Sequence, residues 1–273
     1  MRKSFRFELM AIKLCVCALA LAPTLLFAGK AIIVPSSEAQ TIALAFIKAR
    51  AGDTVLVENG IYRENIFVEA GVILKARHKQ KAILDGKGKG TVVTLGRNSA
   101  VDGFVIRNGT IGVFSKNANN SIINCRIENN WQTGIICVRH LPRIEDNLLV
   151  FNRASGIQGW DVRSTGDAIK HNTIAFNENH GVAIGGKSSV IIENNIIAFN
   201  ERFPYKILPE AEKVKMTNNN FYQNLWQPTA LPSGNFSYDP KFAAPRSGMN
   251  FKSRGNLACP ECPKDQIPGV RTQ

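Results

Sequence analysis

The middle of the 273-residue chain repeats one short motif six times. The copies begin at Val101, Ile122, Ile144, Ile169, Ile192 and Met216, and their fourth residues are spaced by 21, 22, 25, 23 and 24 positions. Each copy holds short runs rich in β-branched residues, and no copy has a helix-length segment. A period in the low twenties built from β-rich runs predicts a solenoid in which every repeat forms one coil.

The first and sixth positions of the motif are apolar in every copy. Stacked strands lie about 4.8 Å apart, so we expect equivalent residues of successive coils to touch and to fill the interior as continuous stacks. The sixth position holds Ile106, Ile127, Leu149, Ile174, Ile197 and Phe221, and the eighth position adds a predicted stack of Phe151, Phe176 and Phe199.

The fourth and ninth positions are mostly asparagine. The fourth holds Asn147, Asn172, Asn195 and Asn219, and the ninth holds Asn130, Asn152, Asn177, Asn200 and Asn224. An asparagine can adopt left-handed backbone geometry at a bend, and its amide can hydrogen-bond to the same amide one coil away. We interpret these residues as corners. A glycine then opens a further strand in four coils, at Gly112, Gly134, Gly156 and Gly181. Together the pattern predicts an all-β, right-handed parallel β-helix with three strands per coil and about eight coils.

The coils that start at Asn147 and Asn172 resemble the repeats of the pectin lyase-like superfamily. The segment 41–64 resembles its N-terminal capping helix and first coil, which implies a helix over 38–50 capped by Ser36 or Ser37. The segment 239–251 resembles its closing segment. The resemblance covers about residues 32–255 and implies one domain over 29–255, closed by 201–255 and followed by a tail over 256–273. It implies a fold but no particular activity.

The first 28 residues have the pattern of an export signal. A basic start precedes an apolar run of about 15 residues from Leu14 to Ala28, which is shorter than the roughly 20 residues that a membrane anchor needs. We therefore predict cleavage near Ala28, a secreted or periplasmic protein, and no membrane association after cleavage. The net charge falls from +13 to +10, because 30 basic and 20 acidic residues remain. Such a charge favours an acidic polysaccharide as partner, whereas export and the lack of a recognisable module argue against nucleic acid.

Four cysteines remain after cleavage: Cys125, Cys137, Cys259 and Cys262. Four cysteines allow three disulfide pairings in an oxidising compartment. Cys259 and Cys262 form a single CxxC motif with no second pair and no histidine nearby, so we expect a tail disulfide or two free thiols and no metal site.

The catalytic motifs of the superfamily are not found in this chain. The segment 139–143 has the wrong spacing for the base motif of pectate lyases. His180 lies in a sequence similar to the Gly-His-Gly of polygalacturonases, but it aligns with Thr133 and Ser155 of ordinary coils, and Asp167 precedes it by only 13 residues. Whether the chain is an enzyme stays open at this point. No cofactor is evident, apart from Ca²⁺ if the chain is a lyase.

The longest regular coil, from Asn147 to Asn172, carries its extra residues between Trp160 and Asp167. A sugar ring can stack on Trp160, and nearby cations can hold an acidic sugar. Aligned on the strand-opening glycines, Arg139, Asp161 and Gly186 share one position, and Lys187 follows. We therefore name Trp160, Arg139 and Lys187 as candidate substrate-binding residues.

Three residues of the same region are candidates for catalysis if the protein cleaves uronic-acid polymers by β-elimination. This reaction needs a base for the C5 proton and neutralisation of the sugar carboxylate, for which Asp161, Arg163 and Lys170 are available. The alternative for Lys170 is structural, because it shares a motif position with Glu145 and Glu193 and can form an alternating charge ladder on the solvated face.

The outward fifth and seventh positions of the motif, which we assign to the third strand of the coil, are unusually apolar at Leu148, Val150, Ile196 and Ala198. An apolar outer face requires a cover, either the segment 201–245 or a second subunit.

Three functions fit these observations. The first is an exported β-helix that binds or processes acidic polysaccharide, for instance as a non-catalytic binding or surface module. The second is a polysaccharide lyase or epimerase acting on uronic-acid polymers. The third resembles the periplasmic β-helix accessory proteins of copper-enzyme assembly. Against it, the chain offers only His78, His140, His171 and His180, and few methionines.

Overall fold

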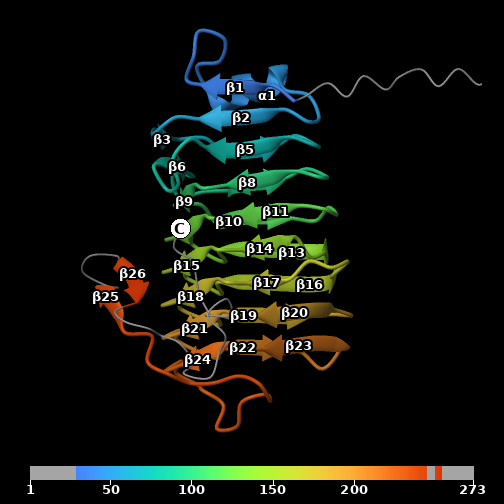
Figure 1. Ribbon diagram of the computed structural model, residues 1–273, viewed down its shortest axis with the longest axis vertical. Coiled ribbons are helices and arrows are strands. Elements are labelled where there is room, and N and C mark those ends of the chain that lie inside the picture. The colour runs from blue at the N-terminus through green and yellow to red at the C-terminus, as the bar shows by residue number, and fades with distance from the viewer. Residues whose placement is uncertain (1–28, 245–249, 254–273) are drawn as a thin grey trace, which may run out of the picture.

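The computed structural model describes residues 29–244 and 250–253, which form a stack of parallel coils (Figure 1). The expected signal peptide, the tail over 256–273 and the cysteines Cys259 and Cys262 lie outside the described residues. The predicted architecture, a right-handed parallel β-helix of about eight coils, is confirmed.

Each complete coil contributes one strand to each of three faces, and the coils at the two ends contribute fewer. The first face holds β1 (Ala31–Val34), β2 (Thr54–Val57), β5 (Ile73–Ala76), β8 (Ala100–Asp102), β11 (Ser121–Ile123), β14 (Arg143–Glu145), β17 (Ile169–Lys170), β20 (Ser189–Glu193) and β23 (Lys213–Thr217). The second face holds β3 (Gly60–Tyr62), β6 (Ala82–Asp85), β9 (Val105–Arg107), β12 (Arg126–Glu128), β15 (Leu148–Val150), β18 (Thr173–Ala175), β21 (Ile196–Ala198) and β24 (Asn220–Tyr222). The third face holds β4 (Ile66–Val68), β7 (Thr91–Leu95), β10 (Ile111–Ser115), β13 (Ile135–His140), β16 (Ile157–Arg163), β19 (Val182–Gly185) and β22 (Tyr205–Ile207).

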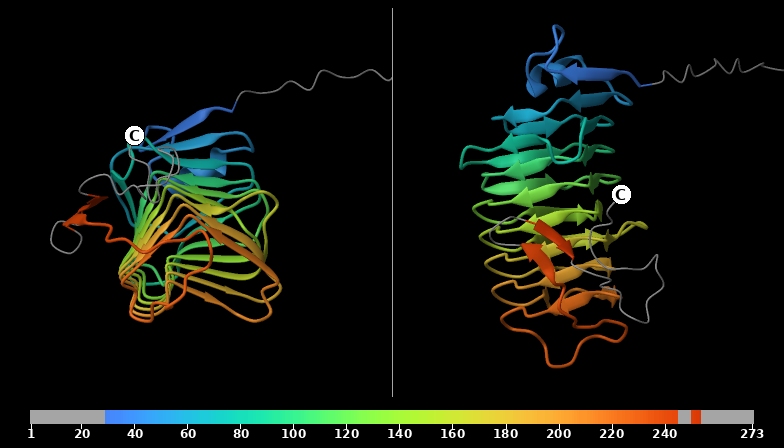
Figure 2. Two further views of the ribbon diagram at one scale, coloured as in Figure 1. Left: turned by 60° about the horizontal axis from the view of Figure 1, so that its bottom comes forward. Right: turned by 60° about the vertical axis from the view of Figure 1, so that its left-hand side comes forward.

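All strands of these faces pair in parallel with the coils above and below, as the two views of Figure 2 show. The second face is an 8-stranded sheet of its own. The first and third faces join into one 16-stranded sheet, because Arg163 at the end of β16 pairs with Ser189 on β20. Two further strands, β25 (Phe242–Ala244) and β26 (Asn250–Ser253), form an antiparallel pair outside the solenoid.

The interior is built from the predicted aliphatic stacks. Ile122 lies in register between Val101 and Ile144, and all three side chains are fully buried. The sixth motif position behaves in the same way from Ile106 to Phe221. Because each fully buried aliphatic side chain contributes about 1.5–3 kcal/mol, these stacks supply most of the driving force for coiling.

The two asparagine ladders are confirmed as hydrogen-bonded stacks. The Asn147 Nδ2 atom donates to Asn172 Oδ1 at 3.0 Å, and the Asn152 Nδ2 atom donates to Asn177 Oδ1 at 2.9 Å. The left-handed geometry expected for these residues is wrong. It lies one residue earlier, for example at His171 (φ 55°) and Phe176 (φ 55°). The turn needs one left-handed residue, and the ladder asparagine must instead direct its amide inward along the axis.

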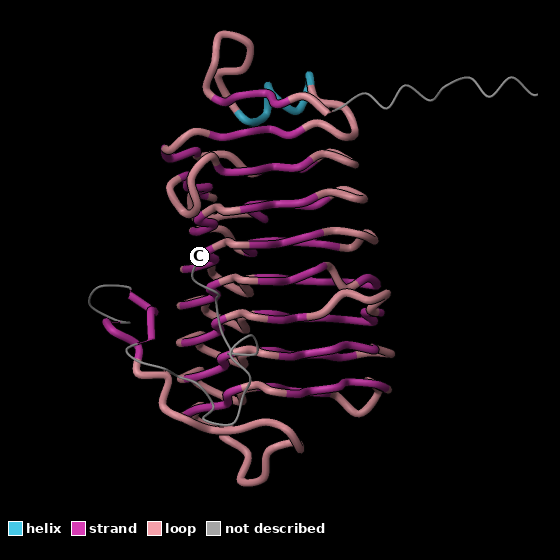
Figure 3. Tube along the Cα trace, viewed as in Figure 1, coloured by secondary structure: helices cyan, strands magenta, loops and turns pink. Residues whose placement is uncertain are grey.

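The predicted capping helix is present but shorter than the expected 38–50: helix α1 (Ile42–Lys48) lies at the N-terminal end of the stack (Figure 3) and buries Ile42, Ala45 and Phe46. Thr41 caps it in place of Ser36 or Ser37, because its Oγ1 accepts a hydrogen bond from the Leu44 amide at 3.2 Å. The Glu64 carboxylate accepts hydrogen bonds from the backbone amides of Ile42 and Ala43, which have no partner within the helix. No helix among the described residues has the length and apolar character needed to cross a membrane.

The glycines that open the third-face strands are required by close packing. A Cβ atom on Gly156 would lie 2.4 Å from Ile174 Cγ2 and 2.9 Å from the Gly181 carbonyl oxygen. The adjacent coils therefore approach so closely that only glycine fits.

The apolar outer side of the second face is covered from within the chain. Leu148, Val150 and Ala175 pack with a stack of phenylalanines, in which the Phe176 and Phe199 rings are 5.0 Å apart. Phe242 of β25 completes the cluster, with its ring centre 6.1 Å from that of Phe199. Phe242 belongs to the segment 201–245, so this segment contacts the face as expected, and cover by a second subunit stays a prediction.

Candidate functional site

The sequence-predicted site centres on Trp160, whose side chain is 47% exposed on β16. Trp160 lies in register between Val138 and Gly185 of the adjacent strands. A Cβ atom on Gly185 would lie 2.4 Å from the Trp160 ring, so the indole lies directly over this glycine. The ring is thus held against the sheet with part of its surface open to solvent.

Asp161 has a structural task beside this ring. Arg139, Asp161 and Gly186 share one position, as their alignment predicts, and the structure adds that all three adopt positive φ. The Asp161 Oδ1 atom accepts a hydrogen bond from the Lys187 amide at 2.9 Å and would be 2.1 Å from a Cβ atom on Gly186. The Asp161 carboxylate therefore fixes the turn of the next coil.

The remaining predicted residues are spread more widely. Arg163 ends β16 and pairs in register with His140 and Ser189. Lys170 lies on β17 of the first face, in register with Glu145 and Glu193, as the charge-ladder alternative requires. The structure therefore brings Trp160, Asp161 and Lys187 together and places Lys170 on another face.

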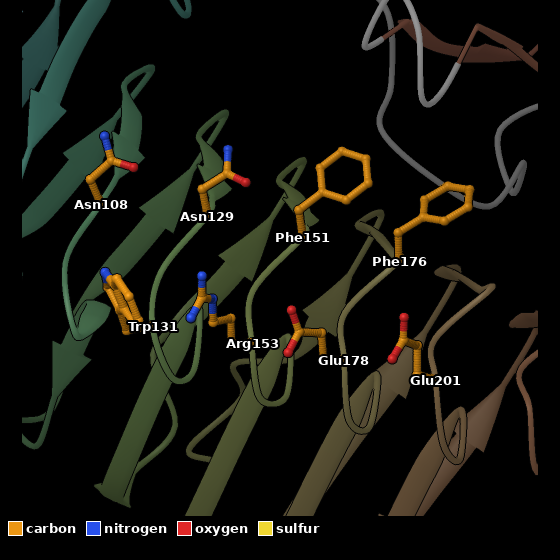
Figure 4. Close-up of a pocket in the computed structure, with 8 residues that line it drawn as sticks. All are labelled: Asn108, Asn129, Trp131, Phe151, Arg153, Phe176, Glu178 and Glu201. Atoms are coloured by element: carbon orange, nitrogen blue, oxygen red, sulfur yellow. The ribbon is translucent and has the colours of Figure 1, made fainter. Parts of the chain in front are cut away.

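A groove of about 530 Å³ lies elsewhere, along the turn between the second and third faces. Two rows of side chains line it, with one residue of each row per coil (Figure 4). The first row is Asn108, Asn129, Phe151 and Phe176, and the second row is Trp131, Arg153, Glu178 and Glu201.

The buried asparagine ladder determines this arrangement. The ladder residues Asn130, Asn152, Asn177 and Asn200 lie between the two rows in sequence, with their amides directed into the solenoid. The backbone keeps the second row in step, because the Arg153 amide donates to the Asn130 carbonyl at 3.0 Å and the Glu178 amide to the Asn152 carbonyl at 3.0 Å. Neighbouring side chains in a row are therefore separated by about one strand spacing, roughly 4.8 Å.

The two ends of the groove carry opposite charge. At the N-terminal end, the Arg153 guanidinium lies 3.9 Å from the centre of the Trp131 ring, which is 52% exposed. At the other end, Glu178 and Glu201 are exposed, and neither forms an ion pair within the described part of the chain.

A lysine-containing loop adds to the basic end. The loop 86–90 lies beside Trp131, because a Cβ atom on Gly88 would be 3.8 Å from the Trp131 Nε1 atom. Asn65 donates to the Lys89 carbonyl at 3.1 Å and holds the loop there. Lys87 and Lys89 thus extend the positive charge beyond Arg153.

The groove residues were not among the predicted site residues, although the sequence holds a signal for them. Trp131, Arg153, Glu178 and Glu201 each follow a ninth-position asparagine. The nine-position motif ends at this asparagine, so a comparison of the motif copies alone does not include the row. A position that changes from Trp to Arg to Glu beside an unchanging Asn indicates an outward row that packing does not constrain.

His180 lies near the acidic end of the groove but belongs to the structure of the coil. Its Nδ1 atom accepts a hydrogen bond from the Phe203 amide at 3.4 Å, and the two rings are 5.7 Å apart. Burial lowers the pKa of His180, and the charges of Arg202 and Lys206 lower it further. The carbonyls of Thr133, Ser155 and His180 accept equivalent backbone hydrogen bonds, which confirms that His180 occupies an ordinary coil position.

The described residues contain no group of three or more metal-ligating side chains. Cys125 and Cys137 are free thiols, fully buried in the core, and burial raises the pKa of Cys125 to about 12. Burial raises the pKa of Cys137 as well. Both thiols are therefore protonated and sealed from solvent, and they are not paired with each other.

Comparison with known proteins places the chain in a family. A family model described as "Periplasmic copper-binding protein (NosD)" matches residues 46–243. Among solved structures, the deglycosylated pectin methylesterase from Aspergillus niger is similar, with 9% identity, a TM-score of 0.39, and coverage of 77% of this chain and 92% of that chain. A search of curated proteins finds no match. Since the family model spans well over half of the chain and the fold is the expected pectin lyase-like β-helix, the protein belongs to the NosD family.

Proposed function

We propose that the protein is an exported, periplasmic β-helix that binds polysaccharide in the groove without cleaving it. The observation that carries this proposal is the row of side chains headed by the Trp131–Arg153 pair. The description of the NosD family supports the periplasmic location, and the net charge of +10 after signal cleavage supports an acidic polymer.

The groove offers the contacts that sugars require. The apolar face of a sugar ring packs on an exposed indole, and Arg153 restrains Trp131 from one side so that little side-chain freedom is lost on binding. The guanidinium of Arg153 and the amides of Asn108 and Asn129 provide donors for hydroxyl and carboxylate oxygens. Lys87 and Lys89 attract a sugar carboxylate to the same end.

The lyase or epimerase alternative lacks an assembled set of catalytic groups among the described residues. A β-elimination needs a base and a neutralising cation around one sugar. Asp161 is engaged with the Lys187 amide, and Lys170 lies on a different face from Arg163. This separation favours a binding protein over an enzyme.

The proposal is tested with the mature protein and oligosaccharides of pectate, alginate and glycosaminoglycans. We expect salt-sensitive binding by isothermal titration calorimetry and no rise in ultraviolet absorbance from an unsaturated product, with or without Ca²⁺. Trp131→Ala is expected to weaken binding about tenfold, because stacking on an indole is worth about 0.5–1.5 kcal/mol beyond the buried area.

Trp160→Ala is the matched control, since Trp160 is similarly exposed but lies outside the groove. Equal binding by wild type and Trp131→Ala would overturn the assignment to the groove. Loss of binding in Trp160→Ala alone would return the site to the loop predicted from the sequence.

A second proposed function, assistance in copper-enzyme assembly, is supported by the family description. The described residues do not suit copper, because Cys125 and Cys137 are protonated and sealed, and no cluster of ligands is present among them. In this role the protein would contact a partner rather than hold the metal. Stoichiometric Cu(I) binding in competition with a colorimetric chelator, retained in a Cys259→Ser, Cys262→Ser variant, would contradict this conclusion.

A further inference from the structure

Glu178 and Glu201 are the charged groove residues that sugar binding, as proposed above, leaves without a role. They lie in the same row as Trp131 and Arg153 and face the same space (Figure 4). Each is exposed, and no described residue forms an ion pair with either of them. In a basic protein, two adjacent uncompensated carboxylates form a negative region beside a positive one.

Because the coils are evenly spaced, the positive and negative side chains of the row follow one another at regular intervals along the groove. Successive side chains of the row are about one strand spacing apart, roughly 4.8 Å. A sugar unit in an extended polysaccharide advances by a similar length, so a chain lying along the groove places about one unit opposite each coil. Two coils then present Trp131 and Arg153, and the next two present Glu178 and Glu201.

Like charges within a few ångströms disfavour binding. Two unit charges 4 Å apart in water repel each other by about 1 kcal/mol, which is a factor of roughly five in affinity. A uronic-acid unit opposite Glu178 or Glu201 meets this repulsion, whereas one opposite Arg153 is attracted. A uniform polyuronate cannot avoid the unfavourable coils, because every unit is charged.

The walls of the groove also change along its length, one coil before the charge does, because Phe151 shares its coil with Arg153. Asn108 and Asn129 line the N-terminal part of the groove, Phe151 lies in the coil of Arg153, and Phe176 lies in the coil of Glu178. The two phenylalanines hold left-handed backbone angles, φ 56° and φ 55°, where the first half has asparagine. Amide groups suit a charged or heavily hydroxylated unit, and aromatic rings suit the apolar face of an uncharged sugar. The coil of Glu178 therefore combines a carboxylate with an aromatic wall, which suits an uncharged unit.

We propose, on the basis of the polysaccharide-binding function above, that Glu178 and Glu201 determine specificity by excluding acidic units from half of the groove. The preferred ligand is a polysaccharide in which an acidic unit is followed by uncharged units. Uniform polyuronates bind more weakly despite their greater charge. Such selection by repulsion is a common way to obtain specificity from a modest contact area.

The test compares tetrasaccharide-sized probes by isothermal titration calorimetry at low ionic strength. The probes are tetragalacturonate, a hyaluronan tetrasaccharide with alternating acids, and xylotriose carrying a single glucuronic acid. We expect affinity to rise in that order for the wild type, by on the order of fivefold for each carboxylate moved away from the glutamates. High salt is expected to reduce the differences in affinity among the three probes, because it screens the exposed charges.

The decisive variant is the isosteric double substitution Glu178→Gln, Glu201→Gln. It is expected to raise the affinity for tetragalacturonate by tenfold or more and to leave the affinity for the singly charged probe unchanged. Arg153→Gln, as the matched control in the other half, is expected to weaken all three acidic probes.

The outcomes separate this inference from the proposed function. If Trp131→Ala abolishes binding of every probe while the double glutamine variant keeps the wild-type order, the groove binds glycan but the glutamates do not select it. If tetragalacturonate is the tightest wild-type ligand, the inference is wrong. If no probe binds the wild type, the proposed function fails first.

Discussion

The ninth position of the coil and the position directly after it follow opposite rules. The ninth holds the same residue, asparagine, in five coils, whereas the next holds Trp131, Arg153, Glu178, Glu201 and Leu225. The ladder asparagines are buried and donate to one another, so a change in one coil leaves its neighbours without partners. The side chain of the next residue lies outside the solenoid and takes no part in the ladder, although Arg153 stacks on Trp131. Repetition therefore marks what the solenoid needs, and variation marks where a ligand can be recognised.

The largest effect is expected from breaking the ladder. The Asn177 amide donates to Asn200 Oδ1 at 2.9 Å and to the Leu149 carbonyl at 3.1 Å, and its oxygen accepts two hydrogen bonds from Asn152. Asn177→Ala leaves several buried groups unsatisfied, at about 1–3 kcal/mol each, so we expect the free energy of unfolding to fall by about 3 kcal/mol or more. Urea unfolding followed by circular dichroism measures this change.

The control is Glu178→Gln, one residue further along the chain. We expect it to change the free energy of unfolding by less than about 0.5 kcal/mol, because the side chain is exposed. Equal destabilisation by the two substitutions would show that the two positions do not follow different rules.

The next largest effect is expected at the apolar cover. Phe242 packs on the phenylalanine stack, with its ring centre 6.4 Å from that of Phe176. Phe242→Ala is expected to reduce the free energy of unfolding by about 1–2 kcal/mol, since the ring is only half-buried, and to increase the binding of a fluorescent apolar dye. Phe67→Ala, at an exposed site on β4, is the control.

The prediction that a second subunit covers this face is tested by the same variant together with a measurement of the oligomeric state. If Phe242→Ala leaves stability unchanged and light scattering finds a dimer, Leu148 and its neighbours are covered mainly by another copy. A monomeric wild type with a destabilised variant supports the internal cover.

A smaller effect is expected from Asp161→Ala. Its carboxylate accepts a single hydrogen bond from the Lys187 amide in an exposed turn, and a capping contact of this kind is typically worth about 1 kcal/mol. We expect slightly lower stability and unchanged affinity for oligosaccharides. A large loss of affinity without a loss of stability would instead restore Asp161 to the functional site.

The same comparison explains what the sequence could predict. The aliphatic stacks, both ladders and the phenylalanine stack were predictable because each recurs in several coils and a single periodic argument covers all of them. The capping residue Thr41 and the left-handed residues before the ladder were not, since they depend on local turn geometry. The extra length after Trp160 pointed to a functional loop, but in the structure β16 continues through it to Arg163, and Asp161 fixes the turn of the next coil. The groove lacks repetition, so periodicity alone could not reveal it.

The smallest effect is expected from His180, three residues beyond the ladder. Its pKa in the folded protein is lowered from 6.5, first by burial and then by Arg202 and Lys206. As the pH falls below about 6.5, the unfolded state takes up a proton that the folded state resists, so the free energy of unfolding decreases. The decrease ends once the pH lies below the lowered pKa.

His180→Gln is expected to remove this part of the pH dependence and to leave the stability above about pH 7.5 close to that of the wild type. Urea unfolding at a series of pH values measures it, with His78→Gln at an exposed position as the control. A pH dependence that His180→Gln leaves intact would mean that the carboxylates, including those of the groove, dominate the acid response. In that case the varying outer positions would contribute to stability as well as to recognition, and the division between repeated and changing positions would have to be redrawn.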